Sequence, residues 1–187
     1  MKLASPTSHV TVLERNPAGV TYGWGVVFWD DLLHDLYQND PPSAREIHRN
    51  AVTWTGQVMG VAGEAAQAGI GTGFSISRRC LLDILSKRAA CLGVDIRFQH
   101  EVERLSEVAD ADLIVACDGV NSRLRQQRAD HFRTEVDVGR NKYIWLGNPE
   151  DLRRLHVCVR ANGRGVDLVP CLPLRRRDEH VYCRMPS

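Results

Sequence analysis

The segment DGVNSRLR, residues 118–125, carries four residues whose types and spacing could bind an anionic ligand. Asp118 can accept protons from hydroxyl or amide groups, and Gly119 lets the backbone approach a ligand closely or adopt a positive φ. Ser122 and Arg125 follow at intervals of three residues, and both can engage phosphate. On spacing alone, a turn followed by a serine-capped helix explains this segment equally well.

A second carboxylate, that of Glu14, closes the short β-branched run HVTVLERN at residues 9–16. We predict a buried strand there. A carboxylate at the end of the second strand of a dinucleotide-binding fold accepts both ribose hydroxyls of an adenosine. The alternative is a solvated acid at a strand end. In that fold a G-x-G-x-x-G loop lies about twenty residues before the acid, and no such segment precedes Glu14 in this sequence.

Patterns of apolar residues predict the elements that must position these side chains. We expect a helix over 29–39 that stops at Pro41-Pro42, a strand over 51–61, a glycine-loosened hairpin or loop over 63–76, a helix over 78–92 and strands over 94–102 and 112–117. The last of these, DLIVAC, is a continuous apolar run typical of a strand buried on both faces. This order of strands and helices predicts an α/β fold with some parallel pairing.

The helix over 78–92 has the clearest ends, because Ser77 can cap its start and Gly93 can close it. We expect one apolar face on it, made by Leu81, Leu82, Leu85, Ala89 and Leu92.

Composition limits the kinds of partner. Among 187 residues, 24 Lys and Arg balance 23 Asp and Glu, so nothing in the net charge of +1 points to nucleic acid or an acidic membrane. There is neither a membrane-spanning apolar run nor a signal-peptide core in the sequence, and we expect a cytoplasmic protein. The six cysteines form no C-x-x-C pair, so metal and disulfide roles are not expected. We expect buried apolar roles for Cys80, Cys91 and Cys117.

Taken together, these segments resemble the FAD-dependent aromatic monooxygenases, the family typified by para-hydroxybenzoate hydroxylase. ACDGVNSRLR resembles the family's DGxxSxxR signature, VTVLERN its acidic second strand, and ISRRCLLDILSKRAACLGVDIRFQHEV the helix and strand between them. TYGWGVVF narrows the resemblance to the branch that includes salicyloyl-CoA 5-hydroxylase and 2-aminobenzoyl-CoA monooxygenase. The resemblance covers roughly residues 1–147.

The resemblance implies a two-domain flavoprotein that binds FAD, takes a hydride from NAD(P)H and hydroxylates a small aromatic substrate, an aryl-CoA among the candidates. Residues 1–147 would form a partial Rossmann-like domain of the FAD/NAD(P)-binding type that lacks its first strand and G-x-G-x-x-G loop. Glu14 would bind the adenosine ribose and Arg15 would sit beside the adenine. Asp118 would lie by the pyrophosphate and ribityl region, with Arg125 as its structural or phosphate partner.

Two further groups of residues are assigned by the resemblance. Arg78 would match the arginine that starts the family's FAD-contacting helix, with Arg79 as the neighbouring candidate. An apolar wall near the flavin ring and substrate would exclude water; it would consist of Trp24, Val26, Val27 and Phe28. The alternative is that these four are core residues. No catalytic acid or base can be named, because none of the seven histidines stands in a recognisable arrangement.

Residues 148–187 differ in composition from the rest of the sequence, because they contain eight Arg and no Lys. Their apolar residues follow neither a helical nor an alternating period. They are either a loop-rich surface or a tail outside the family's reading frame, and we treat them as a separate region. Without the phosphate loop, we expect the chain to be a fragment that alone binds FAD weakly or not at all. Two rival hypotheses are a non-catalytic nucleotide-binding or interaction module and an inactive remnant of a truncated gene.

Overall fold

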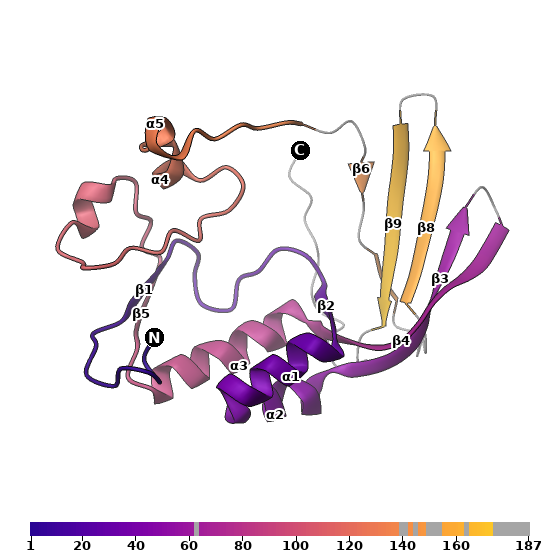
Figure 1. Cartoon of the computed structure of the whole chain (residues 1–187), viewed down its shortest axis with the longest axis horizontal. Helices are drawn as coiled ribbons and strands as arrows, with labels where there is room; N and C mark the ends of the chain where they lie inside the picture. Colours follow the sequence, from indigo (N-terminus) through magenta and orange to yellow (C-terminus); the bar gives the residue numbers. More distant parts are fainter. Residues whose placement is uncertain (62–63, 139–141, 144–145, 149–154, 163–164, 174–187) are drawn as a thin grey trace. The chain divides into compact units, whose positions relative to one another are not determined.

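The computed structural model describes residues 1–61, 64–138, 142–143, 146–148, 155–162 and 165–173 (Figure 1). The chain divides into two compact units. Unit 1 comprises Met1–Ala18 and Gly93–Gly139, and unit 2 comprises Gly19–Leu92 and Arg140–Ser187. The predicted boundary between residues 147 and 148 concerns a different division of the chain, and it stays a prediction.

Unit 1 is built on two short parallel strands. β1 (Thr11–Glu14) pairs with β5 (Asp95–Phe98), with Glu14 opposite Phe98. Three short helical turns follow, namely η1 (Leu105–Val108), α4 (Arg123–Gln126) and α5 (Ala129–Phe132). Both strands were predicted from the sequence. The expectation that the first would be buried is wrong, since its residues are exposed or half-buried.

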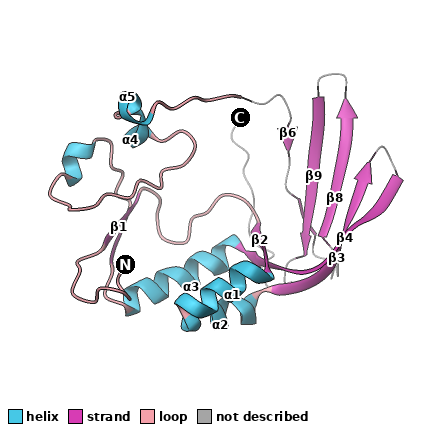
Figure 2. Cartoon of the chain, in the orientation of Figure 1, coloured by secondary structure: helices cyan, strands magenta, loops and turns pink. Residues whose placement is uncertain are grey.

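The predicted strand over 112–117 is not formed. This stretch has no strand assignment and lies in the loop between η1 and α4 (Figure 2). Leu113 and Val115 are 63% and 65% exposed. A strand requires a neighbour to take its backbone hydrogen bonds, and no neighbouring strand pairs with this stretch among the described residues. Cys91 and Cys117 are exposed as well, so their predicted burial is wrong.

Unit 2 contains a mixed sheet with the strand order β2-β4-β3-β8-β9-β6, and β7 also pairs with β9. The strands are β2 (Gly25–Trp29), β3 (Val52–Val61), β4 (Glu64–Ser77), β6 (Lys142–Tyr143), β7 (Leu146–Asn148), β8 (Leu155–Asn162) and β9 (Gly165–Pro173). β3 and β4 form an antiparallel hairpin, and their register shifts at Gly56, where φ is +73°. The hairpin or loop expected over 63–76 is wrong, because β4 is one continuous strand from Glu64 to Ser77. Parallel and antiparallel ladders thus share one sheet, which confirms the α/β class.

β8 and β9 lie in the region for which the sequence predicted neither helix nor strand. They pair with each other in antiparallel fashion, and β8 runs parallel to β3. Residues 174–187, the end of this region, lie outside the described residues.

Three helices, α1 (Asp30–Asn39), α2 (Pro41–Asn50) and α3 (Arg78–Cys91), gather beside β2 and one end of the β3–β4 hairpin (Figure 1). α1 and α3 were predicted. α2 was missed because Pro41-Pro42 was interpreted only as a stop. Proline fits the first turn of a helix, where its missing N–H has no intrahelical acceptor to lose, so the same pair also starts α2.

The core of unit 2 lies between these helices and one face of the sheet. Its buried members are Phe28, Leu33, Ile47, Ala51, Phe74 and Ile76. From α3, the residues that pack against this core are Cys80, Leu81 and Ile84. Leu82 and Leu85 are exposed, so the apolar face expected for this helix is wrong in part. No helix in the described part of the chain has the length and apolar character needed to cross a membrane.

Candidate functional site

The loop that begins at Asp118 is held by its own side chains. Ser122 is 3% exposed and caps α4, because its Oγ accepts a hydrogen bond from the Arg125 N–H at 3.0 Å. The same hydroxyl donates to the Asp118 carboxylate, which also accepts from the Leu124 N–H at 3.4 Å. These bonds, that of Ser122 first, hold the pKa of Asp118 below its ordinary value. Asp118 therefore carries a fixed negative charge at neutral pH.

Arg125 clamps the backbone of this loop. Its Nη1 donates to the Gly119 carbonyl at 3.3 Å, and its Nη2 donates to the Val120 carbonyl. Gly119 has a φ of +90°, which a residue with a side chain rarely adopts, and no atom lies within 4 Å of where its Cβ would be. The loop backbone is therefore open at Gly119. The predicted role of Arg125 as a structural or phosphate partner stays a prediction.

Glu14 is fixed by the turn that follows β1. Its Oε1 accepts hydrogen bonds from the backbone N–H and side-chain amide of Asn16, at 2.8 and 2.7 Å. Its carbonyl accepts from the His100 N–H at 2.9 Å. Glu14 is half-buried, whereas the neighbouring Arg15 is exposed.

Glu14 and Asp118 belong to the same unit, but they do not lie on two paired strands of one sheet. The sequence interpretation placed them at the ends of two strands of one sheet. β1 is formed and residues 112–117 are not, so the common strand edge is not seen among the described residues. Each carboxylate is instead positioned by its local turn.

In unit 2, the start of α3 is joined to the loop before β2. The Arg78 N–H donates to the Trp24 carbonyl at 3.1 Å, which brings together two residues that the resemblance assigned to the cofactor site. The side chains of Arg78 and Arg79 are exposed at the first turn of the helix, whose Ser77 cap accepts from the Cys80 N–H at 3.2 Å.

The predicted apolar wall is divided between the two faces of the sheet. Phe28 is buried and stacks on Phe74 with ring centroids 5.5 Å apart, and Val26 packs against the same core. Side chains alternate along a strand, so Val27 lies on the opposite face. The structure thus has Val26 and Phe28 in the core, which was the alternative interpretation of this segment.

One feature of the face that bears Val27 was not predicted. Gly73 of β4 pairs with Trp29 of β2 on one side and Trp54 of β3 on the other. The two indoles meet edge to face with centroids 4.9 Å apart. A Cβ on Gly73 would lie 2.2 Å from the Trp54 ring. A signal was present in the sequence, because a glycine inside a strand often marks the close approach of another group.

Trp54 holds a polar group that the described structure leaves unpaired. Its side chain is 1% exposed, and within the described residues its Nε1 has no hydrogen-bond acceptor. A buried donor without a partner costs about 1–3 kcal/mol. Groups of this kind call for an explanation beyond packing.

No protein-family model matches the chain. It is 38% identical over 148 residues to the salicyloyl-CoA 5-hydroxylase of a Streptomyces species, an alignment that covers 79% of this chain and 28% of that protein. It is 30% identical over 164 residues to the 3-hydroxy-4-methyl-anthranilyl-[aryl-carrier protein] 5-monooxygenase of Streptosporangium sibiricum, covering 88% of this chain and 46% of that protein. The chain therefore spans less than half the length of these relatives.

Among solved structures, the chain resembles 2-methyl-3-hydroxypyridine-5-carboxylic acid oxygenase. The TM-score is 0.56 at 23% identity, over 67% of this chain and 37% of the oxygenase. At this identity the likeness describes the fold alone.

Proposed function

Because the chain belongs to the FAD-dependent aromatic monooxygenase family, we propose that it is part of an enzyme that hydroxylates an aryl-CoA or a similar aromatic acid derivative. NAD(P)H would supply the reducing equivalents and O2 the oxygen atom. The observation that carries this proposal is the 38% identity over 148 residues with a salicyloyl-CoA 5-hydroxylase. The bound flavin would supply the redox chemistry, and the residues of this chain would bind and orient it.

In unit 1, Glu14 would bind the adenosine ribose, with Arg15 beside the adenine. The hydrogen bonds from Asn16 fix one carboxylate oxygen of Glu14, and the charge of the group remains available to hydroxyl donors. Arg15 is exposed and therefore accessible to a nucleotide.

The loop from Asp118 to Arg125 would lie against the pyrophosphate and ribityl part of FAD. The open backbone at Gly119 supports this fit, since a side chain there would occupy the space that a ligand needs. Asp118 would accept a ribityl hydroxyl. Arg125 would act by holding the Gly119 and Val120 carbonyls, so we propose it as a positioning residue.

In unit 2, Arg78 would contact the cofactor through its exposed guanidinium. The chain's apolar contribution to water exclusion would come from Trp24 and Val27, since Val26 and Phe28 pack in the core. No residue is proposed as a catalytic acid or base.

We also propose that unit 1 represents part of a Rossmann-like FAD-binding domain. Its parallel strand pair β1–β5 supports this proposal, because Glu14 ends β1 and a carboxylate at a strand end of such a fold binds the adenosine ribose.

The experiment for the function as a whole is a titration of the purified chain with FAD, followed by the visible absorbance of the flavin. We expect a saturable spectral change, and aryl-CoA added afterwards should perturb it. Binding of ADP or NADPH without any flavin signal would instead support a non-catalytic nucleotide-binding module.

A further inference from the structure

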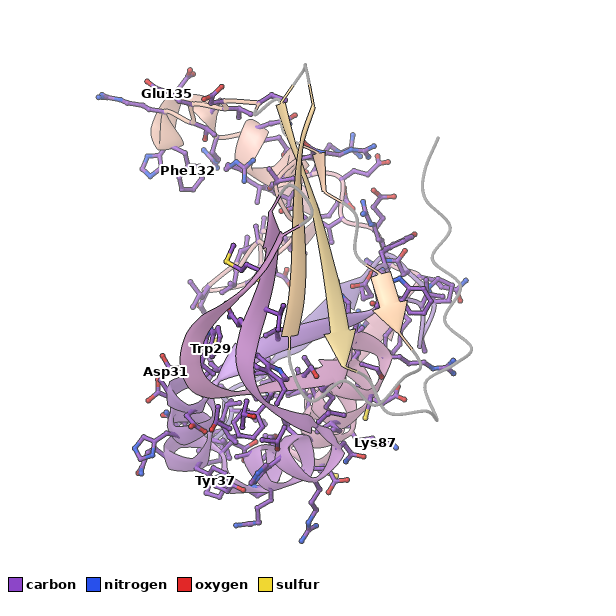
Figure 3. The ribbon with its side chains drawn as sticks, turned by 90° about the vertical axis from the view of Figure 1, so that its right-hand side faces the viewer. Trp29, Asp31, Tyr37, Lys87, Phe132 and Glu135 are labelled. Carbon is purple, nitrogen blue, oxygen red and sulfur yellow. The ribbon has the colours of Figure 1, made fainter. Side chains whose placement is uncertain are left out.

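The face of the unit 2 sheet that points away from its helices carries two tryptophans beside one glycine. Trp29, Gly73 and Trp54 lie in register on three neighbouring strands, and we call them the tryptophan row. Figure 3 shows Trp29 beside the ribbon of the sheet, while Tyr37 lies among the helices. The row is thus separate from the Phe28–Phe74 stack of the core.

We propose that the tryptophan row recognises the aromatic ring of the substrate, with the Trp54 Nε1–H donating to an oxygen substituent on that ring. This inference deepens the proposed function and rests on it. The ligand class is a planar aryl group that carries a hydrogen-bond acceptor at its edge.

The unpaired indole N–H is the first observation that points to a ligand. Trp54 is 1% exposed and its Nε1 lacks an acceptor within the described residues. Phenylalanine would fill the same kind of apolar position without a buried donor. The presence of tryptophan is therefore explained by an acceptor that arrives with the substrate.

Gly73 is the second observation, because it lets the Trp54 ring lie directly on the sheet. The ring atom Cε2, which is bonded to Nε1, lies 2.7 Å from the position a Cβ would take on Gly73. The N–H is therefore held beside the glycine. Gly71, two residues away on the same face of β4, has open space at the equivalent position. The close approach is thus specific to Gly73.

Trp29 is the third observation, since it offers the apolar surface that an aryl ring would contact. Its indole touches Trp54 edge to face and is 44% exposed. Aromatic rings prefer such edge-to-face and offset contacts, so a bound aryl group could replace the Trp29 contact with Trp54 by one of similar energy.

The test compares two ligands that differ only in the ring oxygen, salicyloyl-CoA and benzoyl-CoA. Their binding to the whole chain would be measured by calorimetry, with the wild type and the Trp54→Phe variant. We expect Trp54→Phe to weaken salicyloyl-CoA binding about tenfold and benzoyl-CoA binding less than about twofold, because only the first ligand loses a hydrogen bond. Trp54→Phe also removes part of a buried ring, so we expect its thermal midpoint to fall by a few degrees while the chain stays folded.

Two glycine variants give a second measurement in which neither tryptophan is substituted. Gly73→Ala places a Cβ against the Trp54 ring and should weaken both ligands, whereas Gly71→Ala meets no atom and should weaken neither. If Trp54→Phe does not fold, this pair decides alone. Equal affinities for Gly73→Ala and Gly71→Ala would overturn the inference.

Three further outcomes would also overturn the inference. The first is that the wild type and a folded Trp54→Phe bind salicyloyl-CoA with equal affinity. The second is that the variant loses affinity for salicyloyl-CoA and benzoyl-CoA equally. The third is that the wild type binds neither ligand. An FAD titration of the same samples separates failure of the tryptophan-row inference from failure of the proposed function. Flavin binding without a Trp54 effect rejects the tryptophan row alone, whereas loss of both flavin and aryl-CoA binding rejects the function too.

Discussion

Arg88 donates hydrogen bonds to both carboxylate oxygens of Asp40. Its Nε lies 3.1 and 3.0 Å from Oδ1 and Oδ2, and its Nη2 lies 2.7 Å from Oδ1. Both side chains are half-buried, and Ser43 donates a further hydrogen bond to Asp40. The pair joins the residue that precedes α2 to the last turns of α3, so it fixes these two helices to each other.

Asp40→Asn should destabilise unit 2, because it leaves the Arg88 guanidinium without its charged acceptor. We expect a fall of a few degrees in the midpoint of thermal unfolding, measured by circular dichroism. Asp83→Asn on α3 is the matched control, since Asp83 is exposed and forms no ion pair in the described part of the chain. Equal midpoints for the two variants would argue against the pair as a stabilising contact.

Stability should also fall in acid. The Arg88 hydrogen bonds lower the pKa of Asp40 from its ordinary value of 3.8, and the Ser122 hydrogen bond lowers that of Asp118 in unit 1. A carboxyl whose pKa is lower in the folded state stabilises the fold above its ordinary pKa, and that contribution disappears as the pH falls through the folded value. The free energy of unfolding should therefore be nearly constant from about pH 5 to 8 and drop below about pH 4.

Asp40→Asn supplies the check on that pH dependence. The variant should lose less stability than the wild type between neutral and acid pH, as measured by urea unfolding at a series of pH values. Parallel curves for the two proteins would mean that Asp40 contributes nothing to the acid transition.

The helix cap of α3 gives another stability prediction. Ser77 is buried and accepts the Cys80 N–H, so Ser77→Ala should cost about 1 kcal/mol of unfolding free energy. Ser86→Ala, in the middle of the same helix, should cost much less. Denaturant unfolding of both variants tests this, and a larger loss for Ser86→Ala would contradict the capping role.

The clamp of Arg125 on the loop is testable by hydrogen exchange. Lysine cannot reproduce the two-pronged contact with the Gly119 and Val120 carbonyls, so Arg125→Lys should loosen the loop while retaining the charge. We expect about tenfold faster exchange of the backbone N–H at position 125, which donates to the Ser122 Oγ in the loop, equivalent to about one lost hydrogen bond. The exposed Arg128 offers the control, Arg128→Lys, and equal exchange rates in the two variants would contradict the clamp.

The elements that could be predicted from the sequence are those whose signals are local. The 78–91 helix was found because Ser77 caps it, and β1 and β3 follow from their apolar runs. The long strand β4 was missed, because its glycines indicated a hairpin or loop. The run at 112–117 carries an equally strong apolar pattern and forms no strand, because strand formation depends on a partner that pattern alone does not supply. α2 was missed since Pro41-Pro42 both ends and starts helices.

In the candidate site, too, the local features could be predicted from the sequence and the long-range ones could not. The Ser122 cap and the positive φ of Gly119 were anticipated because they depend on neighbours within a few residues. The tryptophan row was missed because Trp29 and Trp54 meet through the register of three strands, which no single segment of sequence specifies.

The most direct measurement for the central claim is an FAD titration of the wild type, Glu14→Gln and Glu135→Gln. Glutamine keeps an oxygen acceptor for Asn16 and removes the charge offered to the ribose, while the exposed Glu135 serves as control. We predict saturable binding by the wild type and Glu135→Gln, and binding at least about tenfold weaker in Glu14→Gln. Equal flavin affinities of all three proteins, or no saturable binding by the wild type, would contradict an FAD site built on Glu14.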